Sequence, residues 1–87
     1  MDRLDTMRLF VRVVETGSFS KAANVEGVVQ STASKQIAAL ERRLGIQLLR
    51  RTSQGLSTTE EGQAYYESVV KLFADFDEAE AAVRQTV

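Results

Sequence analysis

The stretch that decides the fold runs from Ser18 to Gly45 and reads SFSKAANVEGVVQSTASKQIAALERRLG. It begins with a short helical segment over residues 20–25, and the helix breaker Gly27 follows it. A longer helical segment covers residues 30–44, because its apolar residues recur at spacings of three and four: Ala33, Ile37, Leu40 and Leu44. Two helices joined by a tight turn that contains glycine predict a helix-turn-helix motif.

The face of the longer helix opposite this apolar stripe is polar at its N-terminal end. Its side chains are short or flexible hydrogen-bond donors and acceptors: Gln30, Ser31, Thr32, Ser34 and Lys35. An α-helix fits the major groove of DNA, where its first turns face the base edges. The helix N-terminus also offers free N–H groups and a positive dipole to phosphates. We therefore predict that these five residues contact duplex DNA.

A short β-hairpin is predicted over residues 46–58, with its tip at Thr52–Gly55. Such a hairpin forms a wing that lies on the phosphate backbone or reaches into the minor groove. Its candidate DNA-binding residues are Arg50, Arg51, Thr52 and Ser53. Arg42 and Arg43 end the preceding helix, and two roles are open to them: contact with DNA, or pairing with Glu41 and the acidic residues of the last helix.

Two further helices are expected on either side of this unit. One covers residues 2–16, and the other begins at a capping box of Thr58 and Glu61 and continues to the end of the chain. The last helix carries an apolar repeat of 3.5 residues, formed by Tyr65, Val69, Leu72, Phe76, Ala79 and Val83. A helix of this length outreaches so small a domain, so we expect the excess of the stripe to meet a second copy in a homodimer. The alternative is a stripe packed wholly on its own core.

The predicted fold class is therefore mostly α: a winged helix-turn-helix of three helices and a short β-hairpin, followed by a long C-terminal dimerisation helix. We expect residues 1–58 to form the DNA-binding domain and residues 59–87 the dimerisation helix.

The distribution of charge along the sequence follows a similar division. Residues 21–55 carry six Lys and Arg against two acidic residues, whereas residues 56–87 carry two against seven. A polyanion is attracted to the first segment and repelled by the second.

Composition excludes several classes of function. The 87 residues include no His, Cys or Trp, so the usual ligands of zinc, haem and iron–sulfur groups and the Cys and Ser–His nucleophiles are missing. We expect no metal, no cofactor and no enzymatic activity. A chain without Cys suits the reducing cytoplasm, and no uncharged apolar run is long enough to span a membrane.

Three segments resemble the N-terminal DNA-binding domain of LysR-type transcriptional regulators: LFVRVVETGSFSKAA, SKQIAALERRLGIQLLRRT and LSTTEEG. The resemblance covers residues 3–85. It implies a winged helix-turn-helix followed by a linker helix that pairs antiparallel with that of a second subunit. It also implies DNA contacts by the five residues of the recognition helix and by Arg51, Thr52 and Ser53 of the wing. Family members usually continue into an effector-binding domain, so this chain resembles a truncated regulator more than a stand-alone domain, and any small-molecule effector acts through that further domain.

Three residues depart from the family pattern. Glu26 stands where an apolar Leu is usual, and we expect its carboxylate to rotate outward or to find a partner, because a buried unpaired charge is costly. Val29 stands where Ser or Thr usually caps the recognition helix, which weakens the helix start by about 1 kcal/mol. Ser31 replaces a common Pro, and one expectation is that it caps a helix that begins one turn later.

These observations predict sequence-specific binding of double-stranded DNA by a homodimer, as the DNA-binding part of a LysR-type transcriptional regulator. The alternative is a protein-interaction or dimerisation module that does not bind DNA. Heterodimer formation and the absence of a mobility shift on DNA at low salt distinguish that alternative.

Overall fold

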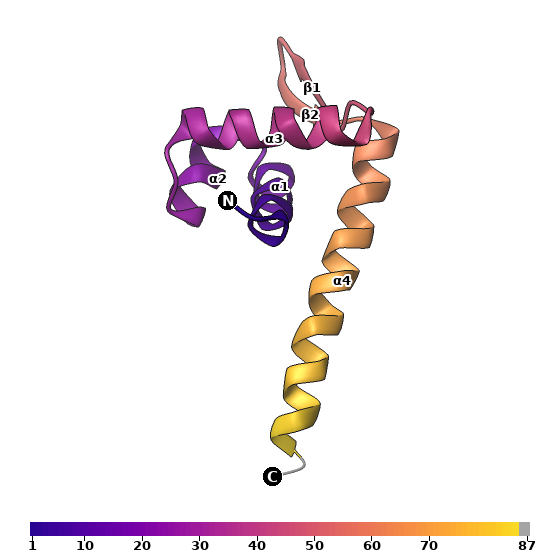
Figure 1. The fold of residues 1–87 in the computed structure, drawn as a ribbon. Helices are drawn as coiled ribbons and strands as arrows, with labels where there is room; N and C mark the ends of the chain where they lie inside the picture. Colours follow the sequence, from indigo (N-terminus) through magenta and orange to yellow (C-terminus); the bar gives the residue numbers. More distant parts are fainter. Residues whose placement is uncertain (86–87) are drawn as a thin grey trace.

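Residues 1–85 are described by a computed structural model, in which a body of three helices and a hairpin lies at one end of a long helix (Figure 1). The elements in chain order are α1 (Arg3–Thr16), α2 (Phe19–Glu26), α3 (Gln30–Leu44), β1 (Leu49–Thr52), β2 (Gly55–Thr58) and α4 (Glu60–Gln85). The molecule measures 52 × 26 × 24 Å, and α4 gives it its length. The predicted fold class, a winged helix-turn-helix with a long C-terminal helix, is confirmed.

Each helix of the body begins and ends at local signals. Asp2 caps α1, since its carboxylate accepts a hydrogen bond of 2.8 Å from the N–H of Asp5. Ser18 caps α2 through a 3.1 Å bond from the N–H of Lys21, so α2 begins one residue before the predicted start. Helix α3 ends at Gly45, whose φ of 70° is the left-handed conformation that glycine adopts without strain.

The core lies where α1, α2 and α3 meet beneath the hairpin. Its buried apolar residues are Leu9, Phe10, Val13, Ala22, Ala23, Ala33, Ile37, Leu40, Leu48 and Leu49. Phe10 and Leu9 are its largest fully buried side chains, while Ala22 and Ala23 keep α2 close to its neighbours. The apolar stripe predicted for α3 therefore faces this core, except for Leu44, which is 41% exposed at the end of the helix.

Glu26 forms a salt bridge with Arg12, with 3.3 Å between Oε2 and Nε, as expected for a carboxylate at an apolar position. The hydrogen bonds that Arg12 donates to Glu26 and Glu15 raise the pKa of its guanidinium above the ordinary value. Helix α3 begins at Gln30 although Val29 provides no side-chain cap, so the expectation of a later start capped by Ser31 is wrong. The backbone bond from Ala33 N to Val29 O, at 3.1 Å, supports this first turn instead.

The hairpin is antiparallel, and its register pairs Leu49 with Thr58 and Thr52 with Gly55. The predicted tip is confirmed, but the first strand begins at Leu49 rather than at residue 46. Residues 46–48 do not pair with β2. Their backbone groups form hydrogen bonds with Glu41 of α3 and with Thr59, which directly precedes α4.

The predicted capping box of α4 is wrong by one residue. Thr59 caps the helix: its hydroxyl accepts a 2.9 Å bond from the N–H of Gly62 and donates a 2.7 Å bond to the carbonyl of Gln47. Its own N–H donates to the carbonyl of Leu48 at 3.0 Å. Thr58 is turned away from this role and bonds to the side chain of Gln63. Within residues 1–85, no helix has the length and hydropathy needed to cross a bilayer.

Candidate nucleic-acid interface

The N-terminal half of α3 presents a polar surface to solvent. Of the five residues predicted there, Gln30, Ser31 and Lys35 are exposed, Thr32 and Ser34 are half-buried, and Ala33 between them lies in the core. Among residues 1–85, none of these five side chains makes a hydrogen bond or a salt bridge within the chain. Their donors and acceptors are therefore available to a ligand in the position that the sequence predicted.

The hairpin brings a second group of polar residues beside α3. Arg51 extends from β1 with its guanidinium carbon 4.6 Å from the centroid of the Phe19 ring, which begins α2. This stacking holds a cation between the wing and the helix-turn-helix. Because side chains alternate along a strand, Arg50 lies on the opposite face of the hairpin, away from Arg51. The structure thus brings Arg51, but not Arg50, toward α3.

The tip of the wing is closed by hydrogen bonds of the Thr52 side chain. The hydroxyl of Thr52 donates a 3.0 Å bond to the carbonyl of Gly55 and accepts a 3.2 Å bond from the N–H of Gln54. Ser53, beside it, is exposed at the end of the hairpin. Thr52 therefore shapes the tip, while Ser53 and the neighbouring arginines are the wing side chains that project into solvent.

A shallow groove separates α3 from the wing, and we name it the α3–wing groove. It is lined by Phe19, Ser34, Ile37, Ala38, Glu41, Gln47, Leu49 and Arg51. A second hollow lies next to it, where Ser18 and Ser20 meet Gln30 and the base of the tip. The hydroxyls of these two serines are 3.1 Å apart. Sequence reasoning treated them only as caps, since their nearness to the wing depends on the tertiary fold.

Glu41 supports the site in a way that sequence reasoning missed. Its Oε2 accepts bonds from the N–H groups of Leu48, at 2.7 Å, and Leu49, at 3.1 Å. A carboxylate on the recognition helix thereby fixes the first residue of the wing. Nothing in the sequence marks this role, because both partners are backbone groups that any residue type supplies.

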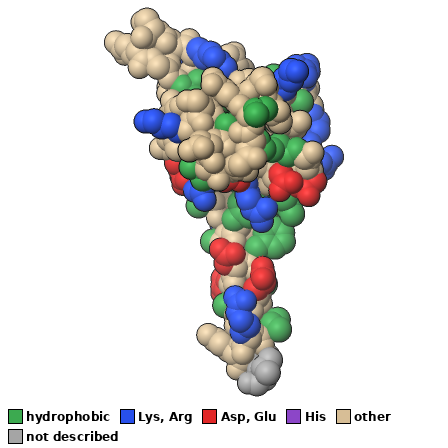
Figure 2. Space-filling view, turned by 90° about the vertical axis from the view of Figure 1, so that its left-hand side faces the viewer, with side chains coloured by type: hydrophobic (Ala, Val, Ile, Leu, Met, Phe, Trp, Pro, Cys, Tyr) green, Lys and Arg blue, Asp and Glu red, His purple; other side chains and the backbone are tan. Residues whose placement is uncertain are grey.

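Positive charge gathers at the end of the molecule that holds α3 and the wing. In Figure 2, the charged side chains over the upper part of the visible face are Lys and Arg, whereas acidic side chains appear at its lower margin and on α4, where Lys and Arg lie among them. Within the described part of the chain, no salt bridge involves the cations of this end: Lys35, Arg42, Arg43, Arg50 and Arg51. Pairing of Arg42 and Arg43 with Glu41 is therefore not seen, and Glu41 bonds to the wing instead.

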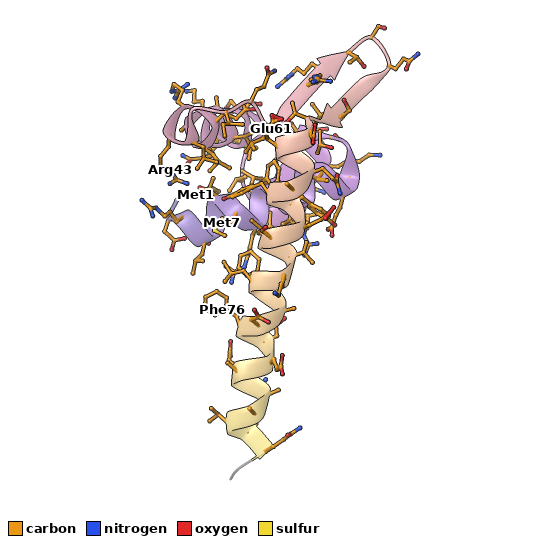
Figure 3. The ribbon with its side chains drawn as sticks, turned by 90° about the vertical axis from the view of Figure 1, so that its right-hand side faces the viewer. Met1, Met7, Arg43, Glu61 and Phe76 are labelled. Atoms are coloured by element: carbon orange, nitrogen blue, oxygen red, sulfur yellow. The ribbon has the colours of Figure 1, made fainter. Side chains whose placement is uncertain are left out.

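The apolar stripe of α4 divides into two parts. Tyr65 packs edge-on against Phe10, with 5.3 Å between ring centroids, and Val69 is buried against its own chain. Leu72 and Phe76 are 40% and 45% exposed, and Ala79 and Val83 also lie on the surface. Figure 3 shows the Phe76 ring projecting from the side of α4, beyond the body of the molecule. Within residues 1–85, the chain thus covers the stripe at Tyr65 and Val69 and leaves it exposed at Leu72 and Phe76.

A helix-turn-helix with an exposed polar recognition helix, a cationic β-hairpin wing and a projecting C-terminal helix defines a winged helix-turn-helix domain of the DNA-binding class. The chain belongs to the LysR family, since residues 4–63 match the family profile described as "Bacterial regulatory helix-turn-helix protein, lysR family".

Known proteins of this family are similar over nearly the whole chain. A transcriptional repressor of Pseudomonas aeruginosa (strain UCBPP-PA14) is 42% identical over 84 residues, which are 97% of this chain and 26% of that protein. The regulator BenM of Acinetobacter baylyi is 46% identical over 72 residues, 83% of this chain and 24% of BenM. The crystal structure of the BenM DNA-binding domain with benA site 1 DNA superimposes with a TM-score of 0.89 at 41% identity, covering 99% of this chain and 96% of that one. The chain thus spans about a quarter of the length of these curated relatives.

Proposed function

We propose that this chain binds double-stranded DNA in a sequence-specific manner as a homodimer and is the DNA-binding part of a transcriptional regulator. The observation that carries the proposal is the exposed face of α3, whose five polar side chains have no partner within residues 1–85 and lie beside an unpaired cationic wing. On a plain three-helix body water satisfies the donors and acceptors of such a face, whereas on DNA the base edges and phosphates take its place.

The residues divide by the part of DNA that they meet. The side chains of α3, from Gln30 to Lys35, enter the major groove, and those at the start of the helix face the base edges. Arg51 and Ser53 of the wing meet the backbone or the adjacent minor groove, where cations supply affinity and a steep dependence on salt. Glu41 sets the distance between these two contacts, because it ties the wing to the recognition helix.

The exposed part of the α4 stripe supports the homodimer. Leu72, Phe76, Ala79 and Val83 follow a heptad spacing that a second α4 satisfies. Two subunits related by a twofold axis present two recognition helices, so the site on DNA consists of two related half-sites.

Relatives support the proposal from a different direction. The BenM and CbnR DNA-binding domains, which share this fold at 41% and 28% identity, were crystallised as DNA complexes. The curated relatives are described as transcriptional regulators or repressors and are about four times as long as this chain. We extend to this chain a role in transcription in the cytoplasm, without catalysis, and place any response to a small molecule in a further domain.

The experiment is selection of DNA fragments by the purified chain, followed by titration of the selected duplex. Lys35→Ala is expected to weaken binding to the selected site by about tenfold, since one lost base contact is worth roughly 1–3 kcal/mol. Lys71→Ala, a matched change on α4 outside the interface, leaves the affinity unchanged. Binding that does not distinguish the selected duplex from random DNA, or a chain that shifts no DNA at low salt and pairs with another protein, contradicts the proposal.

A further inference from the structure

Val29 is an exposed apolar residue at the entrance to the recognition helix. It occupies the N-cap position of α3 in an extended conformation, with φ −77° and ψ 151°, and 65% of its surface is exposed. The preceding residue, Val28, packs against the core and donates its N–H to the carbonyl of Ala23 at 2.9 Å. The chain path that packs Val28 against the core therefore leaves Val29 on the outside.

Val29 contributes neither a helix cap nor a buried side chain. A Ser, Thr, Asp or Asn at an N-cap accepts a hydrogen bond from the first turn, and no side chain does so for α3. An isopropyl group also stands in water, where it contributes nothing to the core. A position that gives up a helix cap and gains no burial in return is expected to serve a function.

We infer that Val29 reads a thymine, by packing against the C5 methyl group that projects into the major groove. This inference rests on the proposed function, because it requires that the first turn of α3 enters that groove. Val29 directly precedes Gln30 and Ser31, so it reaches the same few base pairs. Its side chain has no hydrogen-bonding atom, and the thymine methyl is the only apolar group that a base pair presents in the major groove.

Uracil in place of thymine removes that methyl group and leaves every hydrogen-bonding group of the base unchanged. The test therefore replaces each thymine of the selected duplex, one symmetry-related pair at a time, with deoxyuridine, and measures the affinity of the 87-residue chain. At one position of each half-site we expect the affinity to fall by about fourfold per half-site. This factor corresponds to about 0.8 kcal/mol, the value of burying one methyl-sized group, since 1.4 kcal/mol changes an affinity tenfold.

Val29→Ser identifies the residue that reads the methyl group. The variant gains a capping hydroxyl, so its fold is not at risk, and the deoxyuridine penalty at that position disappears. The matched control is Val25→Ser, which changes a valine of similar exposure, 58%, on the last turn of α2. This control keeps the full penalty.

The outcomes separate the inference from the function on which it rests. Specific binding with no deoxyuridine-sensitive position, a selected half-site without thymine, or a penalty that persists in Val29→Ser each overturns the role of Val29 and leaves DNA binding intact. A chain that selects no sequence overturns both.

Discussion

The two halves of α4 carry one apolar repeat but meet different surroundings. Residues 60–70 lie against the body, where Tyr65 packs on Phe10 and Val69 is buried. In residues 71–85 the contact with the body is confined to the side that faces α1, where the guanidinium of Arg8 lies 5.1 Å from the centroid of the Phe73 ring. Leu72 and Phe76 keep two fifths or more of their surface exposed. The periodicity is the same in both halves, so it identifies the apolar face of the helix and not the partner that covers that face. For the first half the partner is the chain itself, and for the second half we propose a second copy.

The largest effect is expected from removing the aromatic ring that joins α4 to the core. Phe10→Ala deletes a fully buried side chain and its edge-on contact with Tyr65, which costs about 3–5 kcal/mol of unfolding free energy. Thermal unfolding is expected to show a lower Tm at every protein concentration.

Phe76→Ala is the matched change in the second half of the helix. It removes a ring that contacts Phe73 but lies outside the core, so the loss is expected in association rather than in the fold of each chain. Because folding and dimerisation are linked in a dimer of this kind, the Tm of the wild type is expected to rise with protein concentration, and that of Phe76→Ala is expected to rise less. In sedimentation at the same concentration, Phe76→Ala is expected to contain a larger fraction of monomer than the wild type. Equal sedimentation of the two proteins contradicts a dimer built on this stripe.

A second large effect is expected at Gly62, in the first turn of α4, where the helix begins against the body. A Cβ at this position overlaps the carbonyl oxygen and carbon of Leu48, which are backbone atoms held by the cap of α4. Gly62→Ala is therefore expected to lower the unfolding free energy by about 3 kcal/mol, measured by urea unfolding. Ala64→Ser, a change at an exposed position two residues further along the same helix, serves as the control. A Gly62→Ala variant as stable as this control contradicts the close packing.

A smaller effect is expected from the carboxylate that ties α3 to the wing. Glu41→Ala leaves the N–H groups of Leu48 and Leu49 without their acceptor, at a cost of about 1–3 kcal/mol. Glu41→Gln keeps an oxygen acceptor and retains most of the stability. Glu41→Ala is also expected to weaken DNA binding, because the wing is no longer held at a fixed distance from α3. The loss of affinity caused by Glu41→Ala is expected to be smaller when it is introduced into an Arg51→Ala variant, in which the wing has already lost its cation. Additive losses in the double variant contradict a role through the wing.

The sequence predicts best those features that depend on local signals. The bounds of α3 follow from Gly27, Gly45 and the spacing of the apolar stripe, and the exposed face opposite that stripe follows from the same period. The bounds of β1 and the cap of α4 do not follow, because they depend on bonds between distant parts of the chain. One set of bonds joins Glu41 to the start of the wing, and the other joins Thr59 to the loop that precedes the wing.

Among the predicted site residues, Gln30, Ser31 and Lys35 of α3 are exposed, Thr32 and Ser34 are half-buried, and the two arginines of the wing lie on opposite faces of the hairpin. Alternation along a strand separates Arg50 from Arg51, but the strand start was unknown and the facing ring, Phe19, is far away in the sequence. The division of the α4 stripe after Val69 likewise depends on the tertiary fold, since the place of α1 beside α4, with Phe10 against Tyr65, determines which stripe residues are covered.

The smallest effect is expected in alkaline solution, at the contact between the first half of α4 and the body. Burial raises the pKa of Tyr65 above its ordinary value of 10.0, so the neutral phenol is favoured in the folded chain. The stability that this provides is complete below pH 10 and is lost as the pH rises from there through the folded pKa. Tyr65→Phe cannot ionise, so its unfolding free energy is expected to fall less than that of the wild type over this range, as followed by chemical denaturation at a series of pH values.

The control is Tyr66→Phe. The hydroxyl of Tyr66 lies near the surface and bonds to Glu15 at 3.1 Å, so this variant separates the effect of burial from that of a neighbouring carboxylate. Parallel pH profiles for the wild type and Tyr65→Phe would mean that the phenol stays hydrated and that α4 is less firmly seated on Phe10 than the ring contact indicates.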